Sequence, residues 1–196
     1  MARPLAKSPF VLLALGLWIL SSSACLAEDD LESLNQRIYK LFAEGKYQEA
    51  IPVAKKVVEI ARHVRGPEDP DTALSLNNLG ELYKAIGEYT TAEPLLKEAL
   101  RIRQKVLGSE HPDTAESFNN LAELYQAMGE YVKAESRYQE ALRICQKVLG
   151  PEHPNTVTSL NNLAELYQTM GEYAKAEPPP SGSAPDPAEG PWAKRS

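Results

Sequence analysis

The sequence is poor in the residues from which reactive and metal-binding sites are built. It has two cysteines, Cys25 and Cys145, and three histidines among 196 residues. His111 and His153 stand 42 residues apart in Glu-His-Pro triplets, but neither has a third ligand or a cysteine nearby, so we interpret both as turn residues. A nucleophile elbow and a glycine-rich phosphate-binding loop are also absent from the sequence. The sequence therefore predicts no catalysis, no metal and no cofactor.

Basic runs are missing as well. The formal net charge is −6, from 21 Lys and Arg against 27 Asp and Glu. An acidic chain without a basic run does not suit the phosphates of nucleic acids. Nucleic acid is thus excluded as an expected partner.

Long apolar runs are absent except near the start, over residues 10–20. Arg3 and Lys7 precede this run and the small-residue stretch from Ser21 to Ala27 follows it, which is the pattern of a secretory signal peptide cleaved after Ala27. The run is short for a membrane span, which needs ~20 apolar residues. We expect an exported protein, either periplasmic or secreted. Two alternatives stay open: an uncleaved signal that anchors the chain to the membrane, and a lipoprotein acylated at Cys25.

A tandem repeat is what the sequence does contain. The stretches 77–89, 119–131 and 161–173 are copies of one motif with a period of 42 residues, and a weaker copy comes first. In the three clear copies, Pro opens a first helix, as Pro70 does, and Gly ends it, as Gly87 does. Apolar residues at three-and-four spacing lie between them, and a second amphipathic helix follows. The weak first copy predicts helices at about 31–43 and 47–64.

One such helix pair cannot bury its apolar stripe alone, but stacked neighbours can. The predicted fold is therefore an all-α, right-handed α-solenoid of about three repeats plus a truncated fourth. We expect a signal peptide over residues 1–27, a repeat domain over 28–178 and a disordered Pro/Gly/Ser-rich tail over 179–196. The repeats cover about 31–66, 67–108, 109–150 and 151–178, and the abrupt end of the period favours a truncation or a reading-frame change.

The repeat also bears on the second cysteine. Removal of the signal would leave Cys145 without a partner, so no internal disulfide is expected. The equivalent positions one and two repeats earlier hold Arg103 and Ala61. Because this position accepts an arginine, we expect Cys145 to be at least partly exposed.

Helix pairs with Leu-Ala or Leu-Gly, then Tyr, Gly, Tyr and Ala at these offsets resemble the tetratricopeptide repeat. The 42-residue length, with Asn-Asn-Leu-Ala, Ala-Glu-Pro and Leu-Gly-x-Glu-His-Pro, is similar to the kinesin-light-chain type. The resemblance covers about residues 45–178 well. It implies an adaptor whose first helices line a concave groove, where the asparagine before each Leu-Ala pair binds the backbone of an extended peptide. Those asparagines are Asn78, Asn120 and Asn162, while the first repeat departs with Gln36.

The chemistry of such a ladder is sound because an asparagine amide offers both a donor and an acceptor to a peptide unit. First helices on the order of 10 Å apart and a ligand advancing ~3.3 Å per residue would match one asparagine to about every third ligand residue. The alternative is that these asparagines form hydrogen bonds between helices or simply face solvent. We expect further residues to share the groove and to favour basic or neutral peptides, namely Asn77, Asn119, Asn161, Glu81, Glu123 and Glu165.

These observations predict an exported, non-catalytic adaptor that binds a protein or peptide partner whose identity the sequence does not name. Two alternatives remain. One is a structural protein that forms a homodimer through the apolar residues of its incomplete fourth repeat. The other is a truncated remnant of a larger repeat-containing signalling protein.

Overall fold

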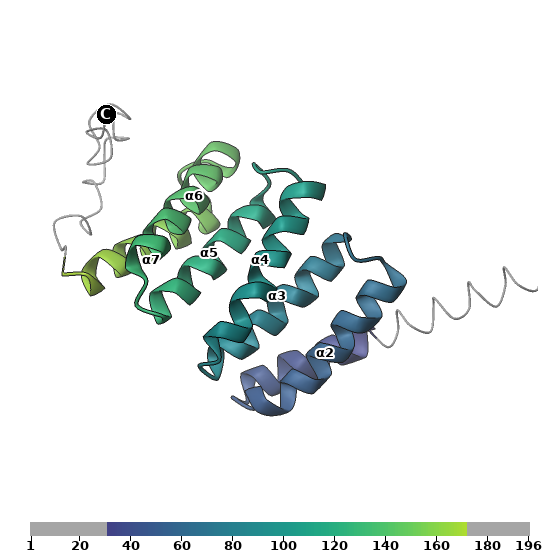
Figure 1. Cartoon of the computed structure of the whole chain (residues 1–196). Coiled ribbons are helices and arrows are strands. Elements are labelled where there is room, and N and C mark those ends of the chain that lie inside the picture. The colour runs from purple at the N-terminus through teal and green to yellow at the C-terminus, as the bar shows by residue number, and fades with distance from the viewer. Residues whose placement is uncertain (1–30, 172–196) are drawn as a thin grey trace, which may run out of the picture.

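The computed structural model describes residues 31–171, and all regular secondary structure in that range is helical. A helix over residues 31–43 comes first. It is followed by α2 (Tyr47–Val64), α3 (Pro70–Ala85), α4 (Tyr89–Val106), α5 (Pro112–Ala127), α6 (Tyr131–Leu149) and α7 (Pro154–Thr169). Successive helices pack side by side along the molecule, so that chain order is also the order in space (Figure 1). The predicted all-α solenoid of helix pairs is confirmed, as are the helices expected at 31–43 and 47–64.

The first helices α3, α5 and α7 each begin at a capping side chain and at a buried threonine, which we call the latch. The side chains of Asp69, His111 and His153 accept a hydrogen bond from the backbone N–H two residues later, which satisfies one of the unpaired donors at the start of α3, α5 and α7. The latch is a threonine hydroxyl three residues after each cap. Thr114 Oγ1, for example, donates to the carbonyl oxygen of Gly108 at 2.9 Å. The two histidines predicted to be turn residues are therefore helix caps.

The first helices end at glycines. Gly87 has a φ of +80°, a conformation that side chains bearing a Cβ rarely adopt. Its amide donates to the carbonyl of Lys84 as the helix closes, and α4 begins two residues later. Gly87 therefore both ends α3 and sets the short connection to its partner helix.

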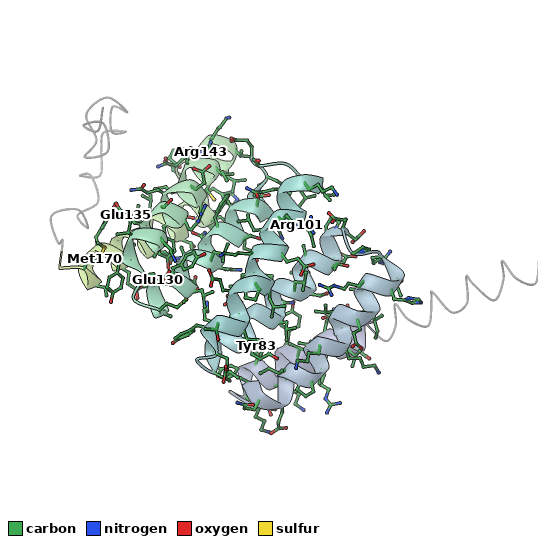
Figure 2. All side chains as sticks on the ribbon, in the orientation of Figure 1. Tyr83, Arg101, Glu130, Glu135, Arg143 and Met170 are labelled. Carbon is green, nitrogen blue, oxygen red and sulfur yellow. The ribbon has the colours of Figure 1, made fainter. Side chains whose placement is uncertain are left out.

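Apolar stripes of neighbouring helices form the core. In α3, Leu76, Leu79 and Leu82 are 0%, 4% and 1% exposed, as the three-and-four spacing predicts. Two buried clusters, one from residue 38 to α4 and the other from α4 to α7, both pack against Tyr83 (Figure 2). Gly80 lets α4 approach closely, because a Cβ there would lie 2.7 Å from Leu96 Cδ2. The core is thus continuous along the stack.

Ion pairs connect the turns before α3 and α5 to the second helices of their repeats, α4 and α6. Glu68, in the turn before α3, pairs with Arg101 and Lys105 of α4 at 3.0 and 3.2 Å. One repeat later Glu110 pairs with Arg143 of α6 at 2.9 Å. Arg101 and Arg143 mark these two positions in Figure 2. The pairs are exposed, so each contributes little to stability.

The prediction that Cys145 is partly exposed is wrong. Cys145 is 2% exposed and its counterpart Arg103 is 4% exposed, because this position faces the first helix of the next repeat. An arginine fits there because its Nη1 donates to the carbonyl oxygen of Asp113 at 2.8 Å and to Ser117 Oγ at 2.9 Å. The Ser159 hydroxyl donates to Cys145 Sγ at 3.9 Å, and burial raises the pKa of this thiol.

The predicted signal peptide, Cys25 and the predicted Pro/Gly/Ser-rich tail lie outside residues 31–171 and stay predictions. Between residues 31 and 171, no helix combines the length and the apolar character that a membrane span requires.

Candidate functional site

The predicted site residues lie on the first helices of the repeats. We call the surface formed by the helix over residues 31–43, α3, α5 and α7 the first-helix face. The structure places three predicted residues on α3, three on α5 and three on α7, at equivalent positions 42 residues apart. Part of each set contacts a neighbouring helix and part is open to solvent.

Three of the predicted asparagines connect helices. Asn120 Nδ2 of α5 donates to Asn77 Oδ1 of α3 at 2.8 Å, and Asn77 is only 3% exposed. Asn119 Nδ2 donates to Ser159 Oγ of α7 at 3.0 Å, while its Oδ1 is buried without a partner. For Asn120, this is the hydrogen bonding between helices that was the alternative to ligand binding. Asn77 and Asn119, which were predicted to share the groove, also bond between helices.

The other three asparagines are more available. Asn78 and Asn162 are half-buried, Asn161 is exposed, and the structure shows no side-chain hydrogen bond for them within residues 31–171. Their amides can therefore pair with a ligand without breaking a contact between helices. Their role in binding remains a prediction.

The three predicted glutamates gather around one part of this face. Lys84 Nζ lies 2.7 Å from Glu81 Oε2 and 2.6 Å from Glu123 Oε2, so it bridges α3 and α5. Burial raises the pKa of Glu81, although Lys84 opposes the shift. Burial alone would lower the pKa of Lys84, but its attraction to Glu81 and Glu123 raises it overall. On α5, the position equivalent to Lys84 holds Gln126. The carboxylates of α5 and α7 are therefore not bridged by a lysine from this position.

The charges of all three carboxylates affect the pKa of Tyr138 in α6. Its hydroxyl donates to Gln126 Oε1 at 3.0 Å. Burial is the main cause of its raised pKa, and the charges of Glu123, Glu165 and Glu81 raise it further. The carboxylates of α3, α5 and α7 thus act on one region of the molecule, which gives the face its acidic character.

Sequence reasoning did not identify Lys84, Tyr138 or a pocket on this face. Lys84 was detectable, because it follows Glu81 by three residues on a helix, a spacing at which opposite charges meet. The pocket has a volume of about 220 Å³ and lies between the helix over residues 31–43 and α3, with Tyr39 and Asn78 among its lining residues. No motif marks it. Among residues 31–171, no group of His, Cys, Asp and Glu is arranged to hold a metal ion.

The repeat geometry agrees with a family comparison. A model described as tetratricopeptide repeat matches residues 31–105, 82–143 and 113–178. The chain belongs to the tetratricopeptide repeat family. Repeats of this family indicate a protein–protein interaction module.

Several solved structures resemble the chain. One is a structure of nearly identical TPR-like repeats assigned to a kinesin light chain from Podosopora anserina. Its sequence is 32% identical to this chain, the TM-score is 0.67, and the match covers 74% of this chain and 69% of that one. The second is BtubC (BKLC) from P. vanneervenii, with 23% identity, a TM-score of 0.62 and coverage of 80% and 69%. RapI in its apo form has 19% identity, a TM-score of 0.64 and coverage of 76% and 52%. The last two show the fold alone. None of the curated proteins matches this sequence.

The kinesin-light-chain type of repeat predicted from the sequence is thus confirmed. The helix pairs, the 42-residue period and the similarity to the Podosopora anserina repeats agree with one another. Proteins built from such repeats are typically adaptors that bind protein or peptide partners.

Proposed function

We propose that this tetratricopeptide repeat protein is an exported adaptor that binds an extended, basic segment of a partner protein along its first-helix face and catalyses no reaction. The observation that carries the proposal is the set of carboxylates Glu81, Glu123 and Glu165, one for each of three successive first helices. Within residues 31–171, Lys84 is the cation that pairs with them, so three carboxylates meet one ammonium and the group keeps a net negative charge. Because Lys84 holds the carboxylates of Glu81 and Glu123 together, basic side chains of an extended peptide would meet this pair as one site and Glu165 as a second.

Binding to this face is best tested with peptides of defined charge and the full-length chain. We expect fluorescence anisotropy to show tighter binding of Lys- and Arg-rich 12-residue peptides than of acidic peptides of the same length. The double variant Glu123→Gln, Glu165→Gln should weaken binding of the basic peptides about fivefold, because exposed ion pairs contribute modestly. Binding should also weaken at higher salt.

A matched control removes the same number of charges elsewhere. Glu98 and Glu140 stand at equivalent positions of the second helices α4 and α6. The double variant Glu98→Gln, Glu140→Gln should therefore bind basic peptides as the wild type does. Equal binding of acidic and basic peptides, or an equal loss in both double variants, would exclude the first-helix face as a basic-peptide site.

The asparagine ladder needs a separate variant. Because Asn77, Asn119 and Asn120 hydrogen-bond within the protein, replacing them would disturb the stack as well as any ligand contact. The double variant Asn78→Ala, Asn162→Ala avoids this. It should weaken the binding of peptides of every sequence by a similar factor, since the amides would pair with the peptide backbone.

Export is proposed from the sequence pattern alone. N-terminal sequencing of the protein from the envelope or secreted fraction should give a sequence that begins at Glu28.

A second candidate function is self-association through α7. Val157 and Leu160 are 43% and 38% exposed, whereas their counterparts in α5, Ala115 and Phe118, are 0% and 5% exposed because α6 covers them. Glu165 is the single charged residue of α7. This combination of an apolar stripe and little charge favours pairing with a second copy of the chain.

A further inference from the structure

The pocket between the helix over residues 31–43 and α3 is suited to one side chain of a ligand. Ala61 and Ser75, 1% and 9% exposed, lie at its base, while Tyr39 and Leu74, 63% and 41% exposed, lie at its rim. Its volume of about 220 Å³ is below the ~300 Å³ at which pockets for small molecules begin. A single residue of a bound peptide fits this size better than a whole metabolite.

The pocket lies in the gap between the first and second repeats. The gap between the second and third repeats shows which side chain the same space accepts. The structural counterpart of Ala61 there is Arg103, and Ser117 and Asp113 correspond to Ser75 and Asp71. Arg103 Nη1 donates to the carbonyl oxygen of Asp113 at 2.8 Å and to Ser117 Oγ at 2.9 Å, and the side chain is 4% exposed. In the first gap the alanine leaves the corresponding volume empty but keeps the serine and the aspartate.

The polar groups of the pocket are ready to accept a guanidinium. Ser75 Oγ donates its hydrogen to the Asp71 carbonyl oxygen at 2.8 Å, so the lone pairs of the hydroxyl remain for an incoming donor. Glu32 and Asp71 place two carboxylates on the walls, against one cation, Arg65, whose Nε lies 3.6 Å from Asp71 Oδ2. The pocket therefore has a negative balance.

The remaining walls suit the rest of an arginine. Leu31 and Leu74 can cover its methylene groups, and the exposed Tyr39 ring can stack against the guanidinium plane. The side chains of Asn35 and Asn78 also line the pocket and form no hydrogen bond within the described part of the chain. They can pair with the backbone of the residue that carries the arginine.

We propose that this pocket binds an arginine side chain of a partner protein, with its guanidinium donating to the Asp71 carbonyl oxygen and to Ser75 Oγ as Arg103 does to their counterparts. The inference deepens the proposed peptide binding and rests on it for the source of the arginine. It predicts a ligand with an arginine at one end of the bound segment and further basic residues that meet Glu123 and Glu165. Lysine should bind less well, because an ammonium cannot stack on the Tyr39 ring as a planar guanidinium can.

A single-residue probe tests the pocket directly. We would titrate the full-length, isotope-labelled chain with N-acetyl-arginine amide and follow the backbone amide signals by NMR. The same titration with N-acetyl-citrulline amide replaces the guanidinium by a neutral group of nearly the same shape. Saturable shifts at Leu74 and Ser75 are expected with the arginine probe, with binding at least about tenfold weaker for citrulline, because hydrogen bonds and ion pairs to the charge are lost.

The variant Ala61→Arg fills the pocket from within. Its new side chain should occupy the position that Arg103 occupies one repeat later and should abolish binding of the arginine probe. Ala61→Cys is the matched control, because it introduces the residue of the third repeat without filling the space, and it should bind as the wild type does. Circular dichroism verifies that each variant is folded.

Equal affinity for the arginine and citrulline probes, or unchanged arginine binding by folded Ala61→Arg, would overturn the proposal. If Ala61→Arg does not fold, the variant Ser75→Ala is the test instead. It removes one acceptor and should lower the affinity for the arginine probe several-fold. Unchanged affinity would again reject the pocket. Because the probe is one residue long, its result does not depend on whether longer peptides bind the rest of the face. The experiments can therefore reject the arginine pocket and support the peptide site, or reject the peptide site and support the pocket.

Discussion

At the scale of single residues, one repeat position takes three forms. Ala61, Arg103 and Cys145 are all buried, at 1%, 4% and 2% exposure, and each faces a serine of the next repeat. Equivalent helices surround the three positions, so the side chain decides what lies there: an open pocket, a hydrogen-bonded guanidinium or a thiol. The chemistry between neighbouring repeats thus varies with this one side chain, while the helices around it stay equivalent.

The buried arginine should contribute more to stability than an exposed one nearby. Arg103→Ala removes two hydrogen bonds from a charged donor, and we expect the free energy of unfolding to fall by about 2 kcal/mol. Arg101→Ala, two residues away on the same helix, breaks only an exposed ion pair with Glu68 and should change stability little. Urea denaturation followed by circular dichroism measures both. Equal losses in the two variants would contradict the role assigned to Arg103.

The site could be predicted only in part at this scale. The period placed Asn78, Glu81 and their counterparts on the first helices, since equivalent residues of a repeat take equivalent positions. It did not show that Asn77 and Asn120 bond to each other, because that distance depends on how two separate helices pack. For the same reason, the expected exposure of Cys145 was wrong.

At the scale of elements, the helices are set by local signals. Pro70 begins α3 after the cap Asp69, and Gly87 follows its end with a positive φ. These preferences belong to a few consecutive residues, so the sequence predicted the helix limits closely. The threonine latch was not predicted, because the donor and the acceptor belong to different parts of the turn and the sequence shows only their constant spacing.

The latch should stabilise every repeat junction. Thr114→Val keeps the shape of the side chain but removes the donor to the Gly108 carbonyl oxygen, and we expect a loss of about 1 kcal/mol in the free energy of unfolding. Thr158→Val is the control, because its hydroxyl bonds to the preceding turn of its own helix at an exposed position. Thermal and urea denaturation of both variants measure the difference. A Thr114→Val protein as stable as the control variant would exclude the latch.

At the scale of the whole molecule, each repeat contacts only its neighbours, so the two ends of the described stack differ from its centre. One end holds the pocket next to α3, and the other end holds the exposed stripe of α7. The acidic first-helix face connects them. A ligand that enters the pocket and a second copy that pairs through α7 would therefore use opposite ends of the stack (Figure 1).

Self-association through α7 gives a separate expectation for the whole molecule. If Val157 and Leu160 pair with a second copy, light scattering should show a dimer at high protein concentration, and Val157→Lys with Leu160→Lys should raise its dissociation constant at least about tenfold. Val132→Lys on α6 is the control, because Val132 is 78% exposed without belonging to the stripe. A strict monomer at high concentration excludes this candidate.

The sequence by itself determined the repeat, the helix limits, the solenoid and the family. All four depend on a 42-residue period and on signals carried by neighbouring residues, which do not need the packing to be known. Only the tertiary structure decided that the position of Arg103 and Cys145 is buried, that Asn77, Asn119 and Asn120 join helices, and that Ala61 leaves a pocket beside Ser75. These features lie between repeats, where the fate of a side chain depends on what the facing helix presents.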